Sequence, residues 1–216
     1  MKNLKTWTLH RLQGVGMVFM TFPAVVAFLL FAAIVGIMKI GAFGESDLIN
    51  NLLLTFLVGA VSNLLLMLLI RRKEGSGGWQ LAVTGIGITV PCGVFLLLYG
   101  MEDVTGLWQA RIIVLMLVML LVILRLLCKH LSCGITEATW LLLRRFLVGL
   151  VFGGVLFIAG VTTVFLTSLL IGMTMTAVVV GQILVFSAFV CLLFVLRAFV
   201  PASHVSTPSE SVGYRR

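Results

Sequence analysis

Residues 146–171 read FLVGLVFGGVLFIAGVTTVFLTSLLI, a run of apolar, small and hydroxyl side chains without one charged residue. A helix crosses the roughly 30 Å hydrocarbon core of a bilayer with about 20 such residues. It also satisfies its own backbone hydrogen bonds, which a lone strand in lipid cannot do. This segment therefore predicts a transmembrane helix.

Five further segments have the same length and character. We predict an all-α, polytopic bundle of six transmembrane helices in a single domain, residues 1–200, with spans at 15–38, 48–70, 79–101, 105–127, 146–171 and 174–196. Hydrophobic residues make up 61% of the chain and charged residues 10%, whereas an ordinary soluble domain carries about 25% charged residues. The mean hydropathy of +1.23 agrees with a protein whose solvent is lipid. An ordinary soluble domain is excluded.

The first span and the third each contain a proline. The first is expected to remain as an uncleaved helix, because its apolar core exceeds the roughly 7–15 residues of a secretory signal. Pro23 lies about two turns into it, and Pro91 lies in the middle of the third span. Since proline lacks a backbone N–H, we expect a bend at each position, tolerated where a neighbour satisfies the freed carbonyl group.

The basic residues set the predicted orientation. Thirteen of the fifteen fall at the two ends of the chain and in alternate connections, where they resist translocation. The set includes Arg71, Arg72, Lys73, Arg144 and Arg145. The opposite side holds only Lys39 and Arg111. We expect both termini to be cytoplasmic, and a multi-pass protein of this kind to reside in a bacterial inner membrane.

The net charge of +8 does not indicate nucleic acid, since that function requires a basic face on a soluble domain. The expected surroundings are the lipid bilayer, with a membrane or soluble subunit as a candidate partner.

Residues 201–216, rich in Ser, Thr and Pro, predict a disordered cytoplasmic tail. Residues 128–145 allow two interpretations, an interfacial helix or the first turns of the fifth span, and we favour the second.

Catalytic and cofactor chemistry find little support. Cys128, His130 and Cys133 lie close together, but a structural zinc site needs four ligands and no second pair is present. A haem held between helices usually takes two histidines at membrane depth, and the three in this chain lie at the margins. We predict no metal, no cofactor and no catalytic residues, which disfavours an enzyme.

A few polar residues inside the spans are candidate ligand or path-lining groups. Asn63, Thr163 and Gln182 are candidates for lining a solute path, although packing is the default use of such side chains. Arg111 has two interpretations. It is either an anchor that reaches the outer interface or a contact for an anionic or quinone-like head group.

Three glycines of the fifth span fall on one helix face. Gly149 and Gly153 make a GxxxG step, and Gly160 follows two turns later. Such spacing permits close approach of a second helix. We expect this span to pack tightly, either inside the bundle or against a partner.

Three functions remain open from the sequence. The first is a membrane-embedded subunit or partner-binding element of a complex, favoured by short loops and the lack of a catalytic constellation. The second is a small-solute transporter or channel-like protein. The third is a haem-free, quinone-interacting membrane anchor of a respiratory oxidoreductase, with quinol near Arg111.

Overall fold

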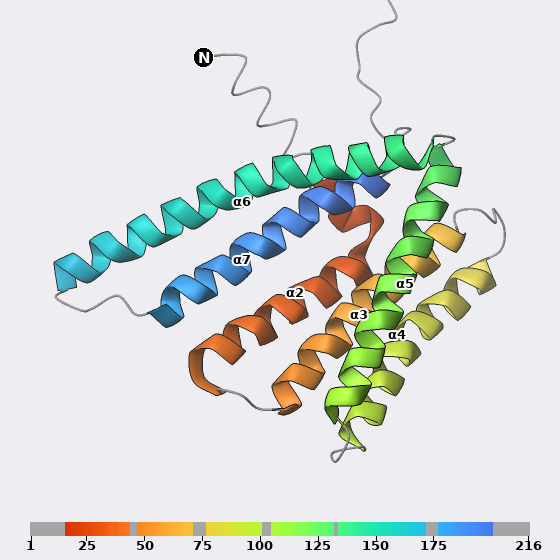
Figure 1. Ribbon diagram of the computed structural model, residues 1–216, viewed down its shortest axis with the longest axis horizontal. Coiled ribbons are helices and arrows are strands. Elements are labelled where there is room, and N and C mark those ends of the chain that lie inside the picture. Colours follow the sequence, from red (N-terminus) through yellow and green to blue (C-terminus); the bar gives the residue numbers. More distant parts are fainter. Residues whose placement is uncertain are drawn as a thin grey trace, which may run out of the picture.

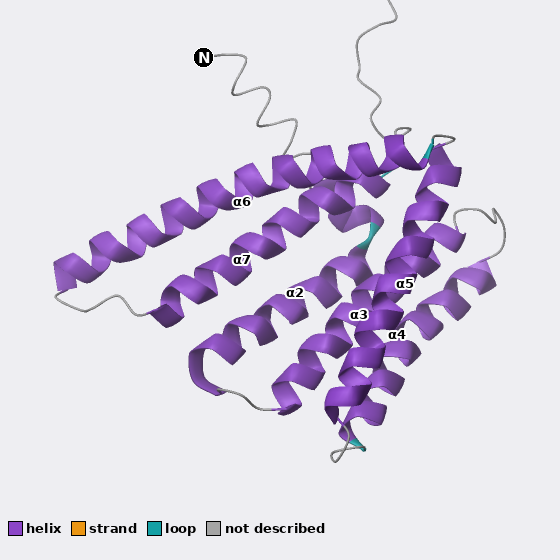
Figure 2. Cartoon of the chain, viewed as in Figure 1, coloured by secondary structure: helices purple, strands orange, loops and turns teal. Residues whose placement is uncertain are grey.

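The structure is a computed structural model that describes residues 16–43, 47–70, 77–100, 105–131, 134–171 and 177–200. These residues are helical almost throughout and include no strand (Figure 2). The helices are α2 (Pro23–Met38), α3 (Asp47–Ile70), α4 (Gly77–Tyr99), α5 (Thr105–Leu131), α6 (Ile135–Ile171) and α7 (Ala177–Leu196), with short turns η1 (Lys39–Phe43) and η3 (Arg197–Phe199). The all-helical prediction is confirmed.

Five of these helices, α2, α3, α5, α6 and α7, are long and apolar enough to cross a membrane. The apolar stretch Gly85–Tyr99 of α4 is shorter. Helices of this length and composition are consistent with a membrane protein. The predicted tail at 201–216 and the basic residues Arg71, Arg72 and Lys73 lie outside the described residues.

Two helix boundaries resolve points that the sequence left open. The helix through residues 16–21 is interrupted at Phe22, and α2 restarts with Pro23 in its first turn, as expected where a proline removes an N–H donor. Helix α6 begins at Ile135, directly after Gly134, so the leucines before Arg144 are its first turns. For residues 135–145 this is the interpretation that we favoured, whereas residues 128–131 belong to the end of α5.

Helix α3 lies at the centre of the arrangement, where it packs against α2, α4 and α5 (Figure 1). Helix α7 packs against α2 on one side and α6 on the other. Half of the apolar stretch of α3 is buried inside the protein, against 11% of that of α6. Helix α6 is therefore an edge helix with a long exposed apolar face.

The pair α6 and α7 is held by close backbone contact. A Cβ atom added at Gly149 would lie 2.7 Å from the carbonyl oxygen of Cys191, and one at Gly153 would lie 2.9 Å from that of Ser187. The Ser187 hydroxyl donates a hydrogen bond of 2.6 Å to the carbonyl oxygen of Gly153. At Gly160 the added atom would meet the side chain of Ile183 at 3.0 Å. All three glycines therefore face α7.

Replacing Gly153 by leucine should separate α6 from α7, because the new side chain would overlap the backbone of Ser187. We expect a loss of about 1–3 kcal/mol in the free energy of unfolding, the usual cost of overpacking. Gly154→Leu is the matched control, since nothing lies within 4 Å of a Cβ atom there. Detergent-denaturation titrations of both variants measure the difference, and equal losses would contradict this packing.

Candidate functional site

Asn63 of α3 makes a buried polar contact with the neighbouring helix α4. Its Nδ2 atom donates hydrogen bonds to the carbonyl oxygens of Gly59, at 2.7 Å, and of Gly87 on α4, at 2.9 Å. Gly87 lies four residues before Pro91, so its carbonyl group has lost the N–H that would bond it in a regular helix. Asn63 therefore replaces the missing donor of Pro91.

Gly87 makes this bond possible. A Cβ atom added there would collide with Oδ1 of Asn63. Any larger residue at position 87 would push α4 away from α3 and lengthen the bond. The pair thus combines a glycine for close approach with an amide that satisfies an orphaned carbonyl group, as membrane helices with internal prolines require.

The other buried polar groups of α3 also have partners within the protein. The Asn51 side-chain oxygen accepts a hydrogen bond of 2.8 Å from Nε2 of Gln109 on α5. The hydroxyls of Thr55 and Ser62 donate to backbone carbonyl oxygens of their own helix. Among the described residues, no buried side-chain nitrogen or oxygen lacks a hydrogen-bond partner. Asn63 and Asn51 therefore join α3 to its neighbours, whereas Thr55 and Ser62 bond within α3.

The three candidate path-lining residues are not brought together. Asn63 is buried between α3 and α4, whereas Thr163 is exposed on α6 and bonds the carbonyl oxygen of Ala159 at 2.8 Å. Gln182 of α7 is half-buried, with its side chain against Gly41. None of the three lines the pocket described below.

Arg111 lies on the exposed surface of α5. Its guanidinium group stacks over the ring of Trp108, with the carbon atom 4.9 Å from the ring centroid. Such a cation–π contact holds the side chain one turn toward the start of the helix. Arg111 does not line the pocket either, since the α5 residues of that pocket begin at Leu117.

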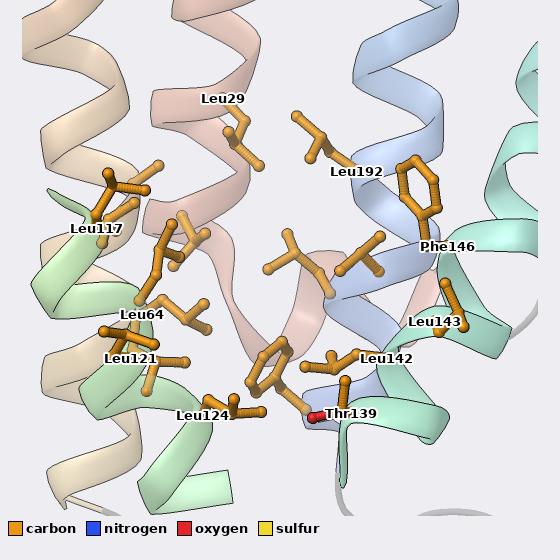
Figure 3. Close-up of a pocket in the computed structure, with 18 residues that line it drawn as sticks. Leu29, Leu64, Leu117, Leu121, Leu124, Thr139, Leu142, Leu143, Phe146 and Leu192 are labelled. Carbon is orange, nitrogen blue, oxygen red and sulfur yellow. The ribbon is translucent and has the colours of Figure 1, made fainter. Parts of the chain in front are cut away.

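An apolar cleft of about 760 Å³ opens between α5 and α6 (Figure 3). We call it the α5–α6 cleft and define it by its 18 lining residues, of which Thr139 alone is polar. The walls are Leu117, Leu120, Leu121, Ile123 and Leu124 of α5 and Thr139, Leu142, Leu143 and Phe146 of α6. The remaining lining comes from α2, α3, α7 and η3. Its volume lies within the roughly 300–1,000 Å³ of known ligand sites.

The two walls of the α5–α6 cleft are joined by a short connection, because α5 ends at Leu131 and α6 begins at Ile135. Arg125 directly follows the lining residue Leu124, and Lys129 lies one further turn along α5. Arg144 directly follows Leu143 on α6. All three cations are exposed, whereas Arg145 is half-buried. Two cations therefore follow the α5 wall toward its end and one lies on the α6 wall, although none of the three lines the cleft.

Among the described residues, no three His, Cys, Asp or Glu side chains lie close enough together to bind a metal ion. Cys128 is buried on α5. The side chains of His130 and Cys133 lie outside the described residues, so the cluster expected from the sequence is not placed.

Sequence reasoning missed the partner of Asn63 and the α5–α6 cleft. A signal for the first was present, because a proline within a span marks the residue four positions earlier as needing a donor. No comparable signal exists for the cleft, whose walls are ordinary lipid-type leucines.

The comparisons with known proteins give no relative. No family model, no curated protein and no solved structure matches this chain.

The bond between Asn63 and Gly87 can be tested by a double-mutant cycle with Pro91. Asn63→Ala should lower the free energy of unfolding by about 1–3 kcal/mol, because it leaves a buried carbonyl group without a donor. In a Pro91→Ala background the residue at 91 supplies its own N–H, so the same change should cost clearly less. Unfolding titrations of the four proteins measure the coupling energy. Equal costs in both backgrounds would show that Asn63 does not act for Pro91.

Proposed function

We propose that this chain is an integral membrane protein that crosses a bacterial inner membrane six times, with both termini cytoplasmic. Helix α4 supports the sixth crossing, because its 23 residues rise about 35 Å and exceed the roughly 30 Å of hydrocarbon. The bond from Asn63 supports it further, since it removes the one carbonyl group that Pro91 would leave unsatisfied in lipid. The distribution of Lys and Arg supports the orientation.

Within that membrane, the protein acts as a membrane-embedded partner-binding element. The observation that carries this proposal is the α5–α6 cleft, a concave apolar site of ligand size. The buried polar side chains of the described residues are already paired elsewhere. Lipid-facing surfaces are normally convex, so a hollow of this volume favours a specific occupant. The cleft offers no described catalytic group, which favours binding over chemistry.

The alternative functions receive less support. A solute path needs polar groups that line one passage, and Asn63, Thr163 and Gln182 lie on separate surfaces. A quinone site at Arg111 needs an apolar slot beside the guanidinium group, whereas Arg111 stacks on Trp108 away from the cleft.

Cysteine labelling in intact membranes tests whether water reaches the region between α3 and α4. Asn63→Cys should be protected from a polar, membrane-impermeant thiol reagent, because position 63 is buried between α3 and α4. A background variant with Cys92, Cys128, Cys133 and Cys191 replaced by serine or alanine removes competing thiols. The positive control is a cysteine introduced within residues 201–216, which the reagent should label once the membranes have been opened. Rapid labelling at position 63, with solute uptake by reconstituted vesicles, would support a transporter and contradict the proposal.

A further inference from the structure

We propose that the α5–α6 cleft binds one phospholipid with an anionic head group, with its acyl chains against the leucines and its phosphate at the basic end. This inference rests on the proposed function and names its partner. It follows from three properties of the cleft, which are its size, its lining and the charge at one end.

The size of the cleft favours a lipid chain over a partner helix. A helix with its side chains is about 10–12 Å across, so a 20-residue span fills roughly 2,500 Å³ or more. The cleft holds about 760 Å³ and is open along one side, so it accommodates part of an acyl chain whose remainder extends into the bilayer, but not the full girth of a helix. Flexible acyl chains adapt to such a slot, whereas a second helix would have to force α5 and α6 apart.

The lining matches a hydrocarbon ligand along its whole length. Leu117, Leu121 and Leu124 follow one another along the α5 wall, at intervals of one helical turn (Figure 3). Leu143 and Phe146 stand on the α6 wall across from them (Figure 3). Leu121 is 67% exposed and Phe146 44%, so these walls are open to an occupant instead of being filled by other parts of the described chain.

The charge at the joined end of α5 and α6 selects the head group. Arg125 and Lys129 are exposed on the last two turns of α5, and Arg144 is exposed next to Leu143 on α6. Among the described residues of these two walls, the one exposed carboxylate is that of Glu137. Arginine and lysine donate charge-assisted hydrogen bonds to phosphate oxygens, and each adds to the attraction of an anionic lipid. A zwitterionic lipid offers the same phosphate but carries a compensating cation, so the basic end favours the anionic lipid.

The test measures lipids retained by the purified full-length protein. It is reconstituted into vesicles of equal parts phosphatidylglycerol and phosphatidylcholine, re-extracted in mild detergent and weighed intact by native mass spectrometry. We expect one retained phosphatidylglycerol per chain. Leu121→Trp should remove it by filling the cleft, whereas Val118→Trp, at a 50% exposed α5 position outside the lining, should retain it. Leu143→Trp fills the opposite wall and repeats the test should Leu121→Trp not fold.

A second pair of variants tests whether the basic residues select an anionic head group. The double variant Arg125→Gln and Lys129→Gln should lose about tenfold or more of its preference for phosphatidylglycerol. Arg111→Gln, which removes a cation at the other end of α5, should keep that preference.

Two results overturn the lipid assignment and separate it from the proposed function. Equal retention of both lipids, or a retained polypeptide that Leu121→Trp releases, would exclude an anionic lipid while leaving a partner-binding cleft. Unchanged retention in both Leu121→Trp and Leu143→Trp would show that the lipid is held outside the cleft, and would overturn the lipid assignment without testing the binding of a polypeptide partner.

Discussion

The hydrogen bond from Asn63 to the carbonyl oxygen of Gly87 shows the constraint on which the rest of the structure depends. An apolar medium offers no partner to a backbone polar group, so each such group must find one inside the protein. Helices meet that demand everywhere except at breaks, and Pro91 is a break. The amide of Asn63 repairs it, and Gly87 lets the amide come close enough to do so.

The same constraint explains how the helices are joined. Few directional contacts are available between apolar surfaces, so those that exist fix which helices are neighbours. Asn63 joins α3 to α4, Asn51 joins α3 to α5 through Gln109, and Ser187 joins α7 to α6. Helices α5 and α6 diverge from the end that they share (Figure 1). The α5–α6 cleft lies between them (Figure 3).

The sequence predicts the helices well, because the length of an apolar run and the position of a proline are local properties. It predicts a bend at Pro23, where the structure interrupts the helix at Phe22 and begins α2. It also assigns the leucines before Arg144 to the first turns of the helix that the structure shows as α6. It identifies Gly149 and Gly153 as one face but cannot name α7 as the partner. Asn63, Thr163 and Gln182 look alike in sequence, yet only Asn63 faces an orphaned carbonyl group. Which helix stands opposite a given face depends on the whole packing, and so does the cleft.

The claim that the chain crosses the membrane six times depends most on α4, because α4 contains Pro91 and needs Asn63 to satisfy the carbonyl group of Gly87. Fusions of a periplasm-active phosphatase and of a cytoplasm-active fluorescent protein after Glu74 and after Asp103 report on its two ends. The account predicts fluorescence without phosphatase activity after Glu74, and phosphatase activity without fluorescence after Asp103. The same reporter active at both positions would mean that α4 does not cross, and would contradict the six-span bundle.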